Sequence, residues 1–297
     1  GIEGDKRLWE CPDLFPMKVE GTNDYKWVLI VSIQKNAPND GTATSYFVGE
    51  FDGKVFKSET VNQKWLDWGT DNYAFVTWNN IPKDDDRILG IGWMSNWQYA
   101  QVVPTEKGRS AMTLPRELSL VKSKSNYFLH SLPVRQFETL RGVSTSLGQI
   151  DITEEKVLEG SFSASQTELD FTVDLKKTTS NSFGIKLQND LGENVFIKFD
   201  KTEGKMVVDR TNSRKDKFAD EFFKNIHAAP IDFEKEKMNI RLIIDAASIE
   251  IFINNGELSF TSIFFPSEKF NTISLFANNG TCNIVNAEIY PLKSIWN

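Results

Sequence analysis

Three segments in the first third of the chain combine carboxylates with large aromatic side chains, a mixture that suits sugar chemistry. The first is Trp9-Glu10-Cys11-Pro12-Asp13, in which a carboxylate lies between a large ring and a proline-restricted backbone. A glutamate among apolar neighbours has its ionised form disfavoured, so its pKa rises and it can serve as a general acid near neutral pH. By themselves these residues favour the plainer interpretation, a surface glutamate beside a turn proline.

The second and third segments contain more aromatic side chains. Trp65-Leu-Asp-Trp-Gly-Thr-Asp-Asn-Tyr-Ala74 places two carboxylates among three rings, and Gly92-Trp-Met-Ser-Asn-Trp-Gln-Tyr99 is an aromatic cluster at the end of an expected strand. Carboxylates accept hydrogen bonds from sugar hydroxyls, and aromatic faces cover the apolar C–H surface of a sugar ring. An aromatic-rich turn explains the second segment equally well, and core packing explains the third equally well.

Charge and hydropathy limit the partners. The chain has 297 residues and a net charge of −7, and its basic residues form no cluster of the kind that neutralises phosphates. No apolar run reaches the roughly 18 residues that a membrane span needs. We therefore expect no nucleic-acid partner and no membrane segment, whereas a neutral sugar fits this charge.

The sequence offers few residues of the kinds that bind metals or cofactors. The two cysteines, Cys11 and Cys282, are far apart and form no CxxC pair, and the two histidines, His130 and His227, lie in neither an HExxH nor a GxSxG context. We expect the histidines at the surface or in turns. We expect no metal site and no cofactor.

Short runs of β-branched and aromatic residues predict an all-β fold. Trp27–Ile33 is typical of a buried strand, and Asp52-Gly53 indicates a hairpin turn between two short strands. The second half of the chain alternates apolar and polar residues in many short strands, which is typical of a β-sandwich. Helical segments are rare, and residues 216–227 form the best one.

Near residues 120–150 the sequence becomes polar and shows no clear periodicity of apolar residues, which indicates a junction between two domains. Our predicted organisation is a first domain over residues 1–135, a linker over 136–150 and a β-sandwich over 151–297.

Four motifs follow one another in the first half: Trp9-Glu-Cys-Pro12, Asp67-x-Gly-x-Asp-x-Tyr-Ala74, Gly92-Trp-Met-x-Asn-Trp97 and Met112-x-Leu-Pro-Arg-Glu-Leu118. In this order they resemble glycoside hydrolase family 32, the invertases, inulinases and levanases. The segments Val208-Asp-Arg210 and Asp245-Ala-Ala-Ser-Ile-Glu-Ile-Phe252 are similar to parts of the C-terminal β-sandwich of that family. The resemblance covers essentially the whole chain.

The resemblance implies a five-bladed β-propeller followed by a β-sandwich. At roughly 40–45 residues per blade, residues 1–135 would supply about the last three blades. It also implies that Glu10 is the acid/base, that Asp71 and Tyr73 lie near the sugar pocket, and that Trp93 forms a pocket wall. The implied substrate is a fructose-containing oligosaccharide or polysaccharide, such as sucrose, inulin or levan, cleaved by a retaining double displacement.

Two motifs of the family do not occur in the sequence, namely the Asn-Asp-Pro motif of the nucleophile and the Arg-Asp-Pro motif of a second aspartate. A retaining glycosidase needs two carboxyl groups about 5–5.5 Å apart, so we expect the chain alone to be inactive. We expect that a missing N-terminal half of the propeller completes the site, or that a homodimer partner covers the open side.

Alternatives remain open at this stage. The chain is alternatively a non-catalytic carbohydrate-binding or truncated, inactive remnant, or part of a fructosyltransferase, which would use the same residues and pass the sugar to another sugar. The sequence does not choose between exo and endo action or between one fructan and another. Because fructan hydrolases of this type are often exported, we expect an extracellular or periplasmic location.

Overall fold

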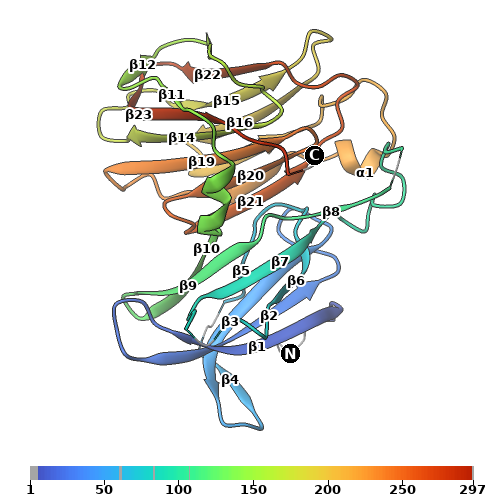
Figure 1. Ribbon diagram of the computed structural model, residues 1–297, viewed down its shortest axis with the longest axis vertical. Coiled ribbons are helices and arrows are strands. Elements are labelled where there is room, and N and C mark those ends of the chain that lie inside the picture. The colour runs from blue at the N-terminus through green and yellow to red at the C-terminus, as the bar shows by residue number, and fades with distance from the viewer. Residues whose placement is uncertain (1–5, 60–61, 83, 107, 296–297) are drawn as a thin grey trace. The chain divides into compact units, whose positions relative to one another are not determined.

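The computed structural model describes residues 6–59, 62–82, 84–106 and 108–295, and the regular secondary structure of these residues is almost entirely strand (Figure 1). The predicted all-β fold is therefore confirmed. The chain groups into two compact units: unit 1 comprises Gly1–Ala100, Gly108–Arg135 and Asn255–Thr261, and unit 2 comprises Gln101–Lys107, Gln136–Asn254 and Ser262–Asn297.

The expected linker over 136–150 falls within unit 2, and a short segment of the second half of the chain belongs to unit 1. The division into domains at 135 and 151 stays a prediction, and the ends of its ranges, residues 1–5 and 296–297, lie outside the described residues.

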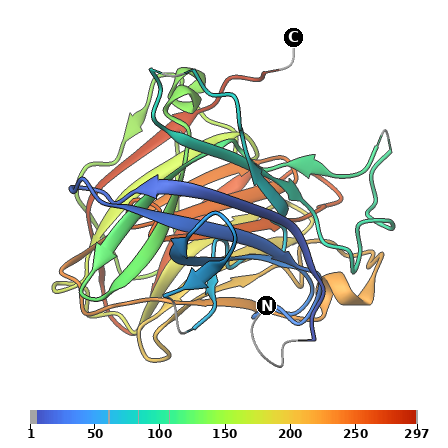
Figure 2. The ribbon, with the colours of Figure 1, turned by 90° about the horizontal axis from the view of Figure 1, so that it is seen from below.

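The first sheet of unit 1 is antiparallel and begins with β1, which is dark blue in Figure 2. Its order is β1-β2-β3-β4, and β5 pairs with β3. The Asp52-Gly53 turn joins β3 to β4 as predicted, with Gly53 at a φ of 90°, where glycine is favoured. The strands are β1 (Trp9–Lys18), β2 (Tyr25–Ile33), β3 (Ala43–Phe51), β4 (Phe56–Ser58) and β5 (Lys64–Trp65).

The second sheet of unit 1 has the order β10-β9-β7-β6, and β8 pairs with β7. It shares one hydrophobic core with the first sheet, in which Val28 and Val48 pack with Phe75 and Leu120. The strands are β6 (Tyr73–Thr77), β7 (Ile88–Met94), β8 (Ala111–Met112), β9 (Arg116–Ser123) and β10 (Asn126–Pro133).

The expected number of about three blades is too high for the described part of unit 1, which holds two sheets. These sheets occupy residues 9–65 and 73–133, longer stretches than the roughly 40–45 residues assumed per blade. Loops and the short strands β5 and β8 take up the difference.

The chain forms two further antiparallel sheets, which belong to unit 2 except for part of one strand. That strand, β21, has its residues 258–261 in unit 1 and its residues 262–263 in unit 2. The orders of the two sheets are β11-β23-β14-β19-β20-β21, with β12 on β23, and β13-β22-β15-β16-β17-β18. The helical part is small: η1 (Arg135–Leu140) is a 3₁₀ turn, and α1 (Asp220–Phe223) covers only part of the predicted helix over 216–227.

The strands of the first of these sheets are β11 (Thr145–Ser146), β12 (Ile150–Ile152), β14 (Thr167–Asp174), β19 (Lys237–Asp245), β20 (Ser248–Ile253), β21 (Leu258–Ile263) and β23 (Cys282–Pro291). Those of the second are β13 (Lys156–Val157), β15 (Ser182–Gln188), β16 (Asn194–Asp200), β17 (Lys205–Asp209), β18 (His227–Pro230) and β22 (Thr272–Asn278).

The prediction of a surface or turn position is wrong for His227. This residue starts β18 and is buried, and its Nδ1 atom has no hydrogen-bond partner. Burial, together with the nearby Arg210 guanidinium, holds the pKa of His227 well below its usual range. The folded chain therefore keeps this imidazole neutral.

A pH effect on stability follows from His227. As pH falls below the ordinary histidine pKa of about 6.5, the unfolded chain takes up a proton that the folded chain excludes, so stability is lost by up to about 1.4 kcal/mol per pH unit. We expect His227→Gln to reduce the loss of stability between pH 7 and pH 5, measured as urea midpoints. His130→Gln, a change in the half-buried histidine of β10, is the control. An unchanged pH dependence in His227→Gln would refute this role.

Candidate active site

Glu10 and Tyr73 lie on β1 and β6, which are edge strands of the two sheets of unit 1 and contact each other. Each residue is followed by a break in the strand register, between Glu10 and Asp13 on β1 and between Tyr73 and Val76 on β6. Bulges of this kind re-aim side chains and are common beside active sites.

The same two bulges carry backbone strain. The residue after Glu10, Cys11, has a φ of 47°, and the residue after Tyr73, Ala74, has a φ of 51°. Residues with a side chain rarely adopt this left-handed region, and such conformations gather where function requires them. The two strained positions therefore mark the same place in unit 1.

The Tyr73 hydroxyl donates a hydrogen bond to Glu10 Oε2. Tyr73 is buried and Glu10 is half-buried. Burial, and then the hydrogen bond to Glu10 and its charge, raise the pKa of Tyr73 above its ordinary value, so the phenol stays protonated and can donate. Two motifs that lie 63 residues apart are thus joined through their functional groups.

Trp93 extends this site with an aromatic wall. It lies opposite Tyr73 in the pairing of β6 with β7, and the two ring centroids are 6.3 Å apart. Trp97 follows at 4.9 Å from Trp93 and is 51% exposed. The rings therefore run from the buried hydroxyl at Glu10 to an exposed indole, as a wall for a sugar ring would require.

Asp71 is fully buried, and side chains that lie close to it in space form hydrogen bonds with its carboxylate. The hydroxyl of Tyr99 donates to Asp71 Oδ1 at 2.5 Å, and that of Thr70 lies 3.4 Å from Oδ2. Asn96 fixes the same turn by donating to the Thr70 carbonyl at 3.0 Å. The sugar-binding role expected of Asp71 stays a prediction. Tyr99 ends the third aromatic segment, and its bond to Asp71 is not predictable from that segment alone.

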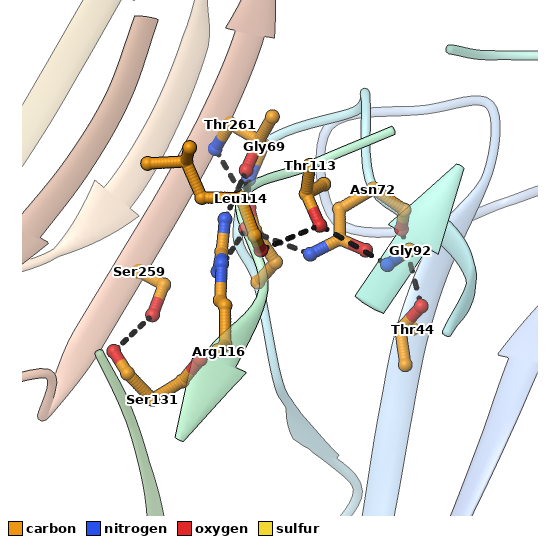
Figure 3. A network of polar contacts seen from close by, with 11 residues as sticks. Thr44, Gly69, Asn72, Gly92, Thr113, Leu114, Arg116, Ser131, Ser259 and Thr261 are labelled. Atoms are coloured by element: carbon orange, nitrogen blue, oxygen red, sulfur yellow. Dashed lines mark hydrogen bonds and ion pairs between the residues drawn. The ribbon is translucent and has the colours of Figure 1, made fainter. Parts of the chain in front are cut away.

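Asp67, the other carboxylate of this motif, is structural. Figure 3 labels the four residues that bond to it, Gly69, Asn72, Arg116 and Thr261. Asp67 Oδ1 accepts from the backbone nitrogens of Gly69 and Thr261, both at 2.8 Å. Its Oδ2 accepts from Arg116 at 3.0 Å, from Asn72 at 3.2 Å and from the Thr261 hydroxyl at 2.6 Å. These bonds fix both ends of the turn that leads to Asp71 and Tyr73.

Arg116 completes this network. Its side chain and that of Asp67 are both 0% exposed, and Arg116 also donates to the Thr261 hydroxyl at 2.7 Å. A charge buried in this way needs its partner, because an unpaired ion away from water is costly. The ion pair therefore positions the turn before Tyr73 rather than reacting itself.

Thr261 reaches this site from a distant part of the sequence, because residues 255–261 belong to unit 1. Gly256 allows the approach: it has a φ of 82°, and an added Cβ would lie 2.4 Å from the Ser131 carbonyl oxygen. Backbone bonds between Ser131 and Gly256 and between Trp68 and Ser259 hold the segment in place. No local pattern indicated that Thr261, which lies 194 residues from Asp67 in the sequence, would bond to it.

Within the described ranges, no group of three or more His, Cys, Asp or Glu side chains could hold a metal ion. Both cysteines are free thiols, exposed at Cys11 and buried at Cys282. No helix among the described residues is long and apolar enough to span a membrane.

Family models match both halves of the chain. The "Glycosyl hydrolases family 32 N-terminal domain" matches residues 2–131, and the "Glycosyl hydrolases family 32 C terminal" model matches residues 136–291. The chain belongs to glycosyl hydrolase family 32. The all-β architecture of a propeller part followed by a β-sandwich, expected from the motifs, is confirmed by this membership and by the solved structures of the family.

The curated relatives include levanases and extracellular exo-inulinases. A levanase of Bacillus subtilis (strain 168) is 38% identical over 97% of this chain, which spans 43% of that protein. An extracellular exo-inulinase of Aspergillus awamori is 32% identical over 98% of this chain, which spans 56% of it. The chain thus spans about half the length of the curated relatives it matches.

Solved family 32 structures share the fold. The crystal structure of the exo-inulinase from Aspergillus awamori matches with a TM-score of 0.86 and 27% identity, over 98% of this chain and 58% of that one. A β-fructofuranosidase from Schwanniomyces occidentalis, complexed with fructosyl-erythritol, matches with a TM-score of 0.84 and 25% identity, over 96% and 60%.

Proposed function

We propose that this chain supplies the acid/base half of a site that hydrolyses β-fructosides, namely fructans or sucrose. One observation carries the proposal: the Tyr73 hydroxyl bonds to the Glu10 carboxyl, so two separate family motifs meet at one ionisable group. The matching relatives are named levanase, exo-inulinase and β-fructofuranosidase, in agreement with this chemistry.

In the proposed reaction, protonated Glu10 gives its proton to the leaving glycosidic oxygen while a second carboxylate attacks the anomeric carbon of fructose. Glu10, now ionised, then takes a proton from water, which displaces the second carboxylate and releases fructose. The hydrogen bond from Tyr73 holds the carboxyl in place for both steps. Trp93 and Asp71 serve as the pocket wall and as a polar group near the sugar.

The second carboxylate is proposed to come from a polypeptide segment outside these 297 residues. The chain spans 43% of the levanase and 56% of the exo-inulinase, which leaves room in such proteins for that segment. We propose that an N-terminal half of the propeller, on the same or a separate chain, supplies it. Alternatively, a second copy of this chain covers the open side, but it does not supply the carboxylate. Without the N-terminal half, the chain has no activity of its own.

We further propose that the protein works outside the cytoplasm, in the medium or the periplasm. The matching exo-inulinase is named as extracellular, which supports this location.

The test is an activity assay of the chain alone and together with the levanase segment that precedes its matched region, or with the segment encoded upstream of its own first codon. We expect fructose release from levan, inulin or sucrose only in the mixtures. Fructose release by the chain alone would refute the need for a second carboxylate. Product analysis separates the alternatives: sugar-to-sugar transfer indicates a fructosyltransferase, and binding without turnover in every mixture indicates a carbohydrate-binding remnant.

Tyr73→Phe tests the hydrogen bond to Glu10 in the completed enzyme. The variant keeps the ring beside Trp93 and removes only the hydroxyl, so we expect kcat to fall about 10- to 100-fold with little change in KM, the effect of losing one hydrogen bond to a charged group. Tyr25→Phe, at a tyrosine that is 62% exposed, is the matched control. A rise in KM alone would show that Tyr73 contacts the sugar and does not act through Glu10.

A further inference from the structure

The sheet of unit 2 that contains β15, β16, β17 and β22 carries a groove of about 570 Å³, a volume typical of ligand sites, which are roughly 300–1,000 Å³. The burial pattern assigns the groove to the face away from the core: Val195, Ile197 and Phe199 of β16 are buried, and the alternate residues Phe196 and Lys198 are half-buried and line the groove. All lining residues belong to unit 2, so none is shared with the Glu10 site.

The strand register explains the floor of the groove. Gly184 of β15 pairs with Lys198 on one side and with Phe276 of β22 on the other, so the sheet has no side chain at this point of its outer face. The Phe276 ring fills part of the space, because a Cβ added at Gly184 would lie 2.9 Å from its Cζ atom. Phe196 lies 6.0 Å from Phe276 in an edge-to-face arrangement. The floor is therefore an aromatic pair.

The rim of the groove is polar and partly fixed. Asp209 lies opposite Phe196 in the register, and its Oδ1 accepts both the backbone and the side-chain hydrogen bond of Thr211, at 2.9 and 2.7 Å. Lys198 is held by Asp200 at 3.1 Å. Side chains oriented in this way can bind hydroxyl groups with little loss of conformational freedom.

The charges of the lining select the ligand class. Three carboxylates, Glu154, Glu155 and Asp209, and one ammonium group, that of Lys198, line the groove, which disfavours phosphates and other anions. Aromatic rings and carboxylates attract cations, but cations of the chain itself already occupy these positions. The ammonium group of Lys186 lies 5.5 Å from the centroid of the Phe196 ring and 3.3 Å from Glu155, and Lys198 pairs with Asp200. Apolar ring faces beside hydrogen-bond acceptors and donors match a neutral sugar.

We propose that this groove binds a neutral oligosaccharide, a stretch of the polymeric fructan that is also the substrate. The proposal rests on the proposed function for its choice of sugar. The bound stretch lies on Phe196 and Phe276 and donates hydroxyl hydrogen bonds to the carboxylates at the rim. The β-sandwich of this chain then holds the polymer while the Glu10 site cleaves it.

Affinity electrophoresis of the 297-residue chain in gels containing levan or inulin tests the groove. We expect Phe196→Ala and Phe276→Ala each to weaken retardation about tenfold, the effect of losing one ring contact. Ile226→Ser, at a groove residue that is 55% exposed and so not needed for folding, is expected to weaken it about threefold. Tyr25→Ala, which removes an aromatic residue that is 62% exposed in unit 1, is the control and should keep the wild-type retardation.

Two further results separate this proposal from the function itself. In the completed enzyme, the groove variants should raise KM for levan or inulin about tenfold and leave kcat and the hydrolysis of sucrose unchanged. Retardation that is lost in Trp93→Ala but unchanged in the groove variants would overturn the groove and leave the Glu10 site intact. Fructan binding at the groove without hydrolysis in any mixture would overturn the proposed function and leave the groove intact.

Discussion

Glu10→Gln is expected to abolish fructoside hydrolysis by the completed enzyme, with kcat/KM reduced about 10³-fold or more. Glutamine is nearly the same size and can still accept the hydrogen bond from Tyr73, but it cannot give a proton to the leaving oxygen or take one from water. General acid help is worth about 10²–10⁴-fold, and the same carboxyl acts in both steps of the proposed reaction. Initial rates with sucrose and levan measure the effect.

The design of this experiment separates acid catalysis from folding. Glu20→Gln, at an exposed glutamate just after β1, should keep full activity. An aryl fructoside with an activated leaving group needs little protonation, so Glu10→Gln should lose much less in its first step, seen as a burst of aryl product. Equal losses with sucrose and with the aryl substrate would contradict the acid role. In the chain alone, we expect the substitution to change nothing measurable.

Arg116→Met is expected to lower the free energy of unfolding by about 3–5 kcal/mol, because it leaves the buried Asp67 carboxylate without its cation. Methionine occupies a similar volume, so the loss of charge rather than of packing dominates. Urea unfolding followed by tryptophan fluorescence measures the change. Arg109→Met, at an exposed arginine of the same unit, should change stability by no more than about 0.5 kcal/mol.

A double variant shows whether the effect comes from the ion pair. Asp67→Asn combined with Arg116→Met removes both charges, so we expect it to be more stable than Arg116→Met alone. The completed enzyme carrying Arg116→Met should also lose activity, since the Asp67 bonds fix the turn before Tyr73. Strict additivity of the two single substitutions would contradict a coupled pair and would reduce Arg116 to a packing residue.

Asp67, Asp71 and Glu10 are three carboxylates whose roles differ because of their surroundings in the folded chain. All three carboxylates lie in aromatic-rich segments, and residue types and spacing alone did not separate them; only the family resemblance assigned roles to Glu10 and Asp71. In the structure, Asp67 is enclosed by five hydrogen bonds from four residues, whereas Glu10 is half-buried and receives the Tyr73 hydroxyl. The partners of a carboxylate decide between support and chemistry. The deciding partners, Arg116 and Thr261 for Asp67 and Tyr73 for Glu10, lie 49 to 194 residues away along the chain.

Sequence patterns correctly predicted those structural features that depend only on residues adjacent in the chain. Alternation along β16 follows from the two-residue period of a strand, and the Asp52-Gly53 turn follows from the backbone freedom of glycine. His227 shows the opposite case. Its neighbours in the sequence do not reveal that it starts a strand and is covered, because burial of one side chain depends on what packs over it.

The sequence by itself determined the all-β class, the family and the segments that contain Glu10, Tyr73 and Trp93, because strand periodicity and short motifs are written in neighbouring residues. Only the tertiary structure decided that Tyr73 bonds to Glu10 and that Thr261 supports Asp67. It also decided the number of sheets in unit 1 and the groove lined by Phe196 and Phe276. The physical reason is that pairing and packing join residues across long stretches of chain, and register and burial exist only once those stretches meet.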